Sequence, residues 1–218
     1  MLQKISEKLQ NSGDNLGNKG KFLCLMHEAG FRVPDGIIVD KSEYENFIDC
    51  NGITEQITKH LSELKKDNVS EKSASVMALF EGTKLTEQVS RTLQTYIKDD
   101  CKYAVRSSGT KEDLEEFSFA GQYQTFLNVQ GIEAIERAVI DCYKSMFTEV
   151  CLNYFVNNRI DCSDLAMSVV VQEMVDSDYS GICFTLNPVT GKDTEMSIEV
   201  APGLGENIVS GKVEPEQY

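Results

Sequence analysis

Three β-rich segments follow one another near the end of the chain, and no helical segment separates them. They read LAMSVVVQEMV from residue 165, SGICFTLNP from residue 180 and EMSIEVA from residue 195. Each is rich in Val, Ile or aromatic residues, and Asp, Gly and Pro mark the turns between them. Parallel neighbours need a long crossover, usually a helix, so consecutive strands of this kind predict an antiparallel section.

Helical periodicity dominates the rest of the chain. Apolar residues recur at helical spacing in residues 18–29, before Gly30, and in 41–66, 85–97 and 131–147. Residues 67–83 are polar and small, and we expect no regular element there. KYAVRS and YQTFLNV, on either side of residues 108–122, have the composition of strands. The pattern predicts an α+β fold with a helical first lobe and a sheet-rich, largely antiparallel second lobe that meet near residue 100.

Composition excludes several classes of protein. The 218 residues contain 35 acids against 21 bases, for a net charge of −14, which argues against binding to a nucleic acid backbone. No window approaches the ~20 apolar residues of a membrane span, and the polar start does not resemble a signal peptide. The seven cysteines form no C-x-x-C pair, so we expect buried thiols rather than disulfides or a zinc site. We therefore expect a cytoplasmic protein with no nucleic acid or membrane partner.

Two stretches have the chemistry of an anion site. GNKGK at 17–21 places Lys19 where a helix begins, and free N–H groups and the helix dipole favour an anion there. Arg106 follows the apolar YAV, and the residues after it, Ser107, Ser108, Gly109 and Thr110, could form turns whose N–H groups converge on phosphate. Taken alone, the first stretch is also typical of an ordinary solvated turn and the second of a solvated surface hairpin.

A third stretch has the chemistry of a base pocket. Gln172, Glu173 and Met174 end the strand SVVVQEM, and paired donors and acceptors beside an apolar wall suit adenine. A solvent-facing strand end is the alternative. His27 and His60 have no nucleophile or metal partner nearby in the sequence, and we expect neither to be catalytic.

Taken together, these stretches resemble one family. The resemblance rests on the order GNKGK, AGFRVPDG, YAVRSS, SFAGQYQTFLNV, VVQEMV, SGICFTLNPVTG and PGLGENIVSGKV. This order is similar to the nucleotide-binding, ATP-grasp-type domain of phosphoenolpyruvate synthase, pyruvate phosphate dikinase and rifampicin phosphotransferase. It runs from about residue 13 to the end, and residues 40–100 contribute no motif.

The resemblance implies a role for particular residues. ATP would lie between a lobe of residues 1–100 and a second lobe of residues 101–218. Lys19 would contact the nucleotide phosphates, and Arg106, the one catalytic residue implied, would contact the transferring phosphates. Gly121 and Thr125 would close a backbone loop over the phosphates, so that residues 107–120 form a lid. Gln172 would lie near the adenine, and Glu173 and Met174 would flank it.

The resemblance also implies what the rest of the protein would do. ATP with Mg²⁺ would phosphorylate a histidine on a downstream domain, which would pass the phosphoryl group to pyruvate on an acceptor domain. Alternatives are a rifamycin antibiotic as the acceptor, or a regulatory module that binds nucleotide without catalysis.

The sequence departs from the family at three points. It has Gly109 where the family usually has alanine, and Asn18 where glycine is common. It stops at VEPEQY, before the family's acidic metal-binding strand. We therefore expect no metal ligands within this chain, an end inside the ATP domain and no activity of the chain alone.

Overall fold

The computed structural model divides the chain into two compact units, residues 1–174 and 175–218. It describes every residue except 1, 10–12, 110–112, 115–116, 119–123 and 163–164. The sequence patterns place a boundary near residue 100. Strands from both sides of residue 100 are paired in one sheet of the first unit.

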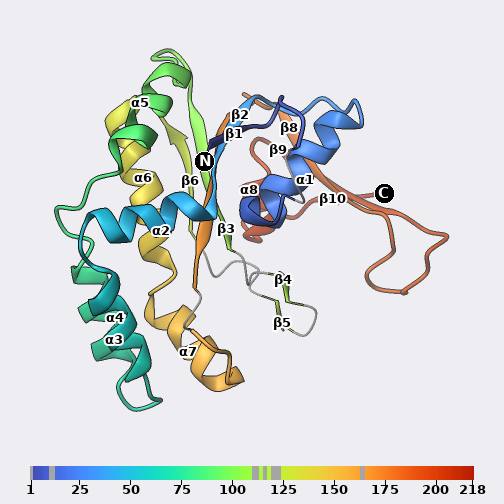
Figure 1. The fold of residues 1–218 in the computed structure, drawn as a ribbon. Coiled ribbons are helices and arrows are strands. Elements are labelled where there is room, and N and C mark those ends of the chain that lie inside the picture. Colours follow the sequence, from blue (N-terminus) through green and yellow to red (C-terminus); the bar gives the residue numbers. More distant parts are fainter. Residues whose placement is uncertain (1, 10–12, 110–112, 115–116, 119–123, 163–164) are drawn as a thin grey trace. The chain divides into compact units, whose positions relative to one another are not determined.

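A five-stranded sheet forms the centre of the first unit (Figure 1). Its order is β1-β2-β7-β3-β6, and all of its pairings are antiparallel. The strands are β1 (Leu2–Lys4), β2 (Gly36–Val39), β3 (Tyr103–Gly109), β6 (Thr125–Val129) and β7 (Met167–Glu173). Two short strands, β4 (Asp113–Leu114) and β5 (Phe117–Ser118), pair with each other outside this sheet.

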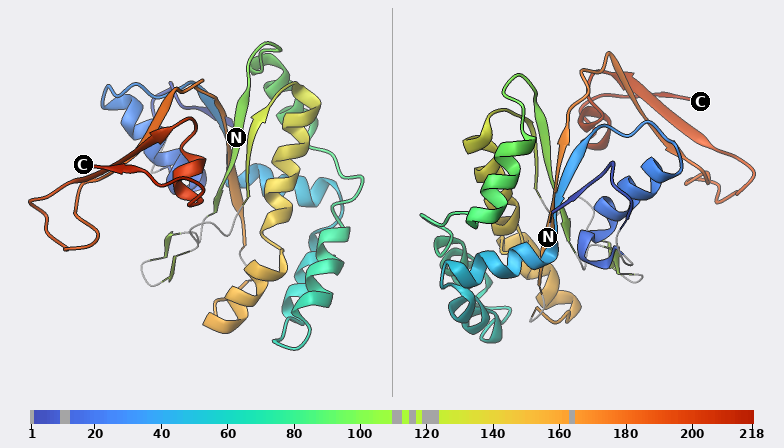
Figure 2. Two further views of the ribbon diagram at one scale, coloured as in Figure 1. Left: turned by 180° about the vertical axis from the view of Figure 1, so that it is seen from behind. Right: turned by 45° about the horizontal axis from the view of Figure 1, so that its top comes forward.

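The two faces of the sheet are covered unequally (Figures 1 and 2). One face packs against six helices, whose side chains join those of the strands in the larger apolar core. These helices are α2 (Lys41–Cys50), α3 (Thr54–Ser62), α4 (Val69–Ala78), α5 (Glu87–Tyr96), α6 (Ile132–Ser145) and α7 (Glu149–Asn158). On the other face, a smaller apolar core lies under α1 (Gly17–Glu28), which follows the 3₁₀ turn η1 (Asp14–Leu16). We call this second face the α1 face.

Residues 67–83 contain a helix that the sequence analysis did not predict. The buried face of α4 mixes Val69 and Val76 with Lys72 and Ser73, so its apolar periodicity is weak. Ser73 Oγ donates to the Phe147 carbonyl at 2.7 Å, and the Lys72 ammonium pairs with Glu63. Polar residues with internal partners therefore occupy positions where an amphipathic pattern would place apolar ones.

The second unit is a small antiparallel sheet with one short helix. Its strand order is β10 (Glu216–Gln217), β9 (Ser197–Pro202) and β8 (Tyr179–Phe184), and α8 (Glu206–Val209) follows β9. The expected antiparallel section is confirmed, with one difference. β8 and β9 pair with each other, whereas β7 belongs to the five-stranded sheet. Every strand pairing in the described part of the chain is antiparallel, so the fold is α+β.

Candidate functional site

The alternation of side chains along β3 and β7 decides which predicted residues share a face. Val105 and its partner Val171 belong to the larger core, whereas Val170 belongs to the smaller core under α1. Arg106 pairs with Val170 on one side and with Thr125 on the other. Because paired residues project from the same face of a sheet, Arg106 and Thr125 lie on the α1 face.

Arg106 lies within a strand rather than after one. β3 continues to Gly109, and Ser107, Ser108 and Gly109 pair with residues of β7. The expected turn at 107–109 is therefore wrong, and the predicted lid loses its first three residues to the sheet. The arginine is half-buried on the face of the sheet instead of standing free at its end.

Lys19 lies in the first turn of α1, as the sequence predicted, but its backbone N–H is not open to an anion. This N–H donates to Ser108 Oγ at 3.2 Å. Any contribution of Lys19 to an anion site must therefore come from its side chain. The expectation that this helix start offers free N–H groups fails at Lys19.

The charge of Lys19 affects the pKa of Cys142, whose side chain lies beside the paired strands β3 and β6. Burial and the Asp141 carboxylate raise the pKa of the Cys142 thiol, and the positive charge of Lys19 lowers it. The Cys142 sulfur lies 3.9 Å from the Gln124 carbonyl oxygen, directly before Thr125. Lys19 is tied to this strand pair through its backbone, because its N–H donates to Ser108 on β3.

Gln172 is buried on the α1 face rather than exposed at a strand end. It pairs with Gly36 on one side and Ala104 on the other, and its Nε2 donates to the Pro34 carbonyl at 3.1 Å. Its amide is thus fixed in orientation, as recognition of a base requires.

Met174 extends the β7 ladder, because its N–H donates to the Lys102 carbonyl at 2.9 Å. Alternation then places its side chain on the same face as Gln172. Its sulfur accepts a hydrogen bond from the Asn128 N–H at 2.9 Å. Asn128 has a positive φ of 57°, and the β3–β6 register shifts nearby, as at a β-bulge.

Glu173 differs from the other predicted residues. It lies between Gln172 and Met174 in an extended strand, so its side chain projects from the opposite face, among the helices. There its carboxylate accepts a hydrogen bond from the Lys98 ammonium at 2.7 Å, and this bond raises the pKa of Lys98. The structure thus separates Glu173 from the face shared by Arg106, Thr125, Gln172 and Met174.

Gly121 and most of the predicted lid lie outside the described residues. The described parts of that segment are the two strands β4 and β5.

A cavity of about 220 Å³ lies where α1 begins and β3 ends. Its lining residues come from the turn before α1, from α1 and from the end of β3, and they are Gly13, Asp14, Gly17, Asn18, Lys21 and Gly109. The Lys21 ammonium lies 3.6 Å from the Asp14 carboxylate. The sequence analysis did not single out Lys21, although it stands two residues after Lys19 in the same glycine-bounded motif.

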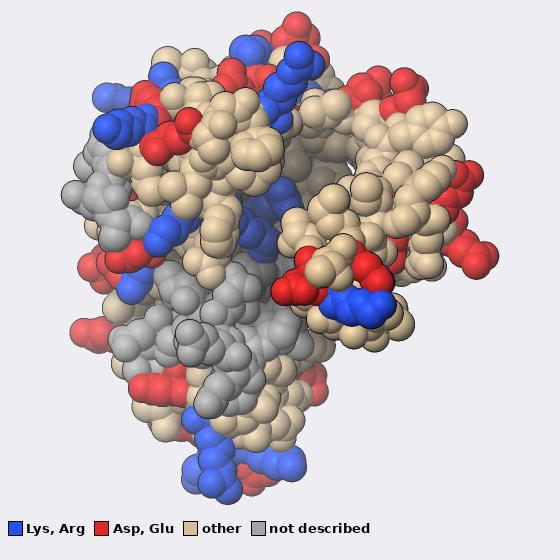
Figure 3. Space-filling view, turned by 90° about the vertical axis from the view of Figure 1, so that its right-hand side faces the viewer, with Lys and Arg blue, Asp and Glu red and all other residues tan. Residues whose placement is uncertain are grey.

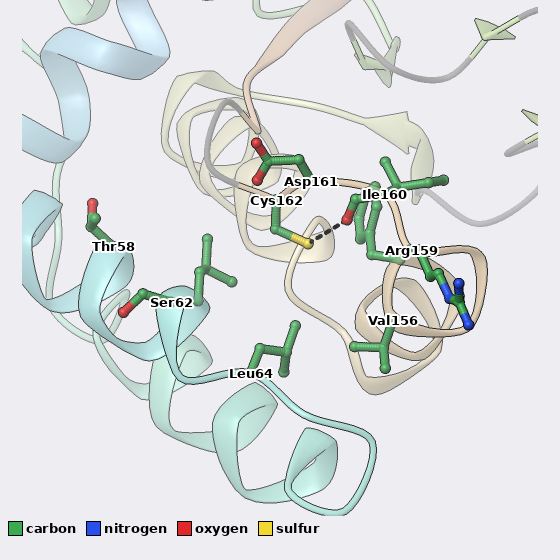
Figure 4. A pocket seen from close by; sticks show the side chains of 10 residues that line it. Thr58, Ser62, Leu64, Val156, Arg159, Ile160, Asp161 and Cys162 are labelled. Atoms are coloured by element: carbon green, nitrogen blue, oxygen red, sulfur yellow. Dashed lines mark hydrogen bonds between the residues drawn. The ribbon is translucent and has the colours of Figure 1, made fainter.

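A separate cavity of about 530 Å³ lies between α3 and the end of α7 (Figure 4). Its lining is mainly apolar, Cys162 Sγ lies 3.6 Å from the Ile160 carbonyl oxygen, and the Arg159 side chain points away from α3. None of the predicted nucleotide-binding residues lines this cavity.

Both histidines lie apart from the predicted phosphate residues. His27 is in the last turn of α1, eight residues after Lys19. His60 is on α3, and its Nδ1 is buried with no hydrogen-bond partner. Within the described ranges, His, Cys, Asp and Glu side chains form no group of three or more that could hold a metal ion.

Acidic and basic side chains alternate over the surface visible in Figure 3 and do not form one basic field there. Among the helices in the described part of the chain, none has the length and apolar character needed to cross a bilayer.

A family model and individual relatives assign the chain to the same family. The chain matches the model of the pyruvate phosphate dikinase AMP/ATP-binding domain over residues 13–218. It is 37% identical over 213 residues to a probable phosphoenolpyruvate synthase of Methanothermobacter thermautotrophicus, covering 93% of this chain and 31% of that protein. It is 36% identical over 228 residues to a probable phosphoenolpyruvate synthase of Methanocaldococcus jannaschii, covering 100% of this chain and 19% of that protein.

A rifampicin phosphotransferase is similar to a comparable degree. The protein of Bacillus cereus is 36% identical over 210 residues, which cover 93% of this chain and 24% of the relative. The chain therefore spans between 19% and 31% of the length of these three relatives. Because the family model matches nearly the whole sequence, the chain belongs to the pyruvate phosphate dikinase AMP/ATP-binding domain family.

Proposed function

We propose that this chain binds ATP on the α1 face of its five-stranded sheet, within an ATP-grasp-type fold. The observation that carries the proposal is the convergence of five predicted nucleotide-binding residues on that face. Four come from strands separated by up to 68 residues (Arg106, Thr125, Gln172 and Met174), and Lys19 comes from the helix above them. Antiparallel register, not proximity in sequence, brings them together.

The phosphates would lie toward Lys19 and Arg106. A guanidinium fork can hold two phosphate oxygens at once, and an ammonium adds a compact charge, so the two groups complement each other at a triphosphate. Thr125 lies directly opposite Arg106 across β3 and β6 and has an exposed side chain that could reach the same oxygens. Gly121 remains a prediction from the resemblance alone.

The adenine would lie toward Gln172 and Met174. The Gln172 amide is held by the Pro34 carbonyl, and the Met174 thioether offers an apolar, polarizable surface. Glu173 could contribute through its backbone, because its side chain projects from the other face.

Mg²⁺ would enter with the nucleotide, held by phosphate oxygens, since Mg²⁺ often combines phosphate ligands with one or two carboxylates. The described residues supply no metal-binding group of three ligands, so phosphate oxygens would be its main ligands here.

We propose that this chain is the ATP-binding part of a longer protein, which we call the parent protein. This parent protein would be a cytoplasmic dikinase-type phosphotransferase. In it, the ATP-binding part would act with a phosphohistidine domain and an acceptor domain that uses pyruvate. The names of the relatives favour pyruvate, and two rifampicin phosphotransferases among them keep a rifamycin hydroxyl as the second candidate. A regulatory module that binds nucleotide without catalysis is a third candidate.

Calorimetric titration with ATP tests the binding proposal. The wild-type chain should bind ATP, and Lys19→Ala should weaken binding. Lys66→Ala is the matched control, because it removes the same charge from an exposed turn after α3. Equal affinities of the two variants would contradict the assignment of Lys19, and no binding by the wild-type chain would contradict the proposed function.

An assay of AMP formation by the parent protein distinguishes the two acceptors. Incubated with ATP, it should form many equivalents of AMP when pyruvate is added if it is a pyruvate dikinase, and only when a rifamycin is added if it is an antibiotic phosphotransferase. Nucleotide binding without AMP formation under either condition would favour the regulatory module.

A further inference from the structure

Three segments that are distant in sequence meet at one buried point where α1 begins. They are the start of the helix at Gly17, Ser108 on β3 and Ser168 on β7. Ser108 and Ser168 are fully buried and directly opposite each other in the sheet. We call these three residues the serine junction.

Ser168 connects the helix to the sheet. Its Oγ lies 2.5 Å from the Leu16 carbonyl oxygen, immediately before α1, and 3.0 Å from the Ser108 carbonyl oxygen. Ser108 Oγ in turn accepts the Lys19 N–H at 3.2 Å. Hydrogen bonds thus link Ser168 on β7, through Ser108 on β3, to the backbone of Lys19.

The junction leaves no space for adjustment. A Cβ added to Gly17 would lie 2.3 Å from Ser108 Oγ and 2.8 Å from Ser168 Oγ. The helix backbone therefore approaches the two hydroxyls as closely as glycine alone permits. Small changes at the junction must move the first turn of α1 relative to β3.

We propose that Ser168 is a positioning residue for the nucleotide, one that fixes the distance between the Lys19 ammonium and the Arg106 guanidinium. Arg106 stands two residues before Ser108 on the same strand and face, while Lys19 is held to Ser108 through its backbone. The positions of both cations thus depend on β3, and Ser168 anchors the turn that precedes Lys19. This inference rests on the proposed ATP-binding function.

Local sequence favours a role beyond packing. Ser168 precedes three valines in β7, and a buried hydroxyl destabilises a core unless it is hydrogen-bonded. An apolar residue would fill the position between helix and sheet, but it would not hold the Leu16 carbonyl. The hydroxyl supplies that directional contact.

The test compares Ser168→Ala with a buried serine elsewhere. Ser73→Ala is the matched control, because Ser73 Oγ also donates to a carbonyl of a distant segment, Phe147, at 2.7 Å, on the opposite face. Affinities for ATP and for adenosine are measured by calorimetry, together with amide exchange at Lys19. Ser108→Ala serves as a second variant of the same junction if Ser168→Ala does not fold.

We expect Ser168→Ala to weaken ATP binding about tenfold and to leave adenosine binding within about twofold, since the two cations act on the phosphates. Exchange at the Lys19 amide should become faster. Ser73→Ala should lower the melting temperature and change neither the affinities nor this exchange rate.

Three results would overturn the inference: unchanged ATP affinity in Ser168→Ala, equal losses for ATP and adenosine, or the same ATP-specific loss in Ser73→Ala. A wild-type chain that binds no ATP would refute the proposed function instead. In that case faster Lys19 exchange in Ser168→Ala alone would still assign the positioning of α1 to Ser168, and unchanged exchange would refute it.

Discussion

At the scale of single residues, the position of Arg106 within β3 has an energetic consequence. A half-buried guanidinium on the face of a sheet loses little side-chain freedom when it binds an anion. The same half-burial reduces the screening of its charge by water. Arg106 should therefore contribute more to phosphate binding than an exposed arginine.

We predict that Arg106→Ala weakens ATP binding by about 1.5–3 kcal/mol, which is about 10- to 150-fold in the dissociation constant. Arg91→Ala is the control, because Arg91 is an exposed side chain on α5 that pairs with Glu87. Calorimetry should find the control within about twofold of wild type. An equal affinity for wild type and Arg106→Ala would remove Arg106 from the site.

The chemistry of these residues could be predicted from the sequence, but their neighbours could not. GNKGK and YAVRSS identify Lys19 and Arg106 as cations beside glycine and hydroxyl residues. The alternation of side chains along a strand is by itself enough to separate Gln172 from Glu173, although the sequence analysis grouped them. The contact between Ser108 and Ser168 spans 60 residues, and no local pattern indicates it.

At the scale of elements, the attachment of α1 depends on Gly17. Its φ is +64°, and the space around it is filled by Ser108 and Ser168. Gly52, between α2 and α3, has nearly the same φ of +66° and no atom within 4 Å of an added Cβ. The two glycines therefore separate the backbone cost of a substitution from its steric cost.

We predict that Gly52→Ala lowers the free energy of unfolding by about 1–2 kcal/mol, the cost of a left-handed conformation for alanine. Gly17→Ala should lower it by a further ~1–3 kcal/mol, because a methyl group must displace a rigid junction. Urea denaturation measures both variants. Equal losses would mean that the junction yields without cost, which would also weaken the case for Ser168.

Elements with clear periodicity were predicted well, and the exceptions have physical causes. α1, α5, α6 and the strands β3, β6, β7, β8 and β9 agree with the patterns in the sequence. α4 was missed because its buried face contains Lys72 and Ser73, whose partners, Glu63 and Phe147, lie outside the helix. A turn was predicted at Ser107, Ser108 and Gly109, since serines and glycine favour turns. Pairing with β7 overrides that preference.

At the scale of the whole molecule, buried acidic groups determine how stability responds to alkali. Burial is the largest cause that raises the pKa values of Tyr44, Tyr143 and Cys142, with nearby carboxylates adding to it. In the unfolded chain these groups titrate near their ordinary values of 10.0 for tyrosine and 9.0 for cysteine. The unfolded chain therefore loses protons first as the pH rises.

Proton binding determines the direction in which the free energy of unfolding changes with pH. The native state binds more protons than the unfolded state above about pH 9, so the free energy of unfolding should fall as pH rises. We expect Tyr143→Phe to reduce the slope above about pH 10 by ~1.4 kcal/mol per pH unit, because it removes one such group. Urea unfolding of both proteins should have the same pH dependence between about pH 7 and 8.5. Equal slopes above pH 10 would contradict the assignment.

The last prediction concerns phosphoryl transfer by the chain alone. Transfer to a histidine requires the imidazole in line with a phosphate that cations hold in place. His27 is eight residues along α1 from Lys19, about 12 Å at the helical rise per residue. His60 lies on α3, on the helix-covered face opposite Lys19 and Arg106, and its Nδ1 is buried.

Neither histidine can therefore reach phosphates held at Lys19 and Arg106 without a rearrangement of the sheet or of α1. We predict that residues 1–218, incubated with Mg²⁺ and ATP labelled at the β or the γ position, form no AMP and acquire no acid-labile label. The parent protein, treated in the same way, is the positive control and should be labelled on a histidine outside this chain if the dikinase proposal is correct. Label on the isolated chain that disappears in His27→Asn or His60→Asn would show that these histidines do reach the nucleotide. It would also require that the nucleotide bind elsewhere than on the α1 face beside Lys19.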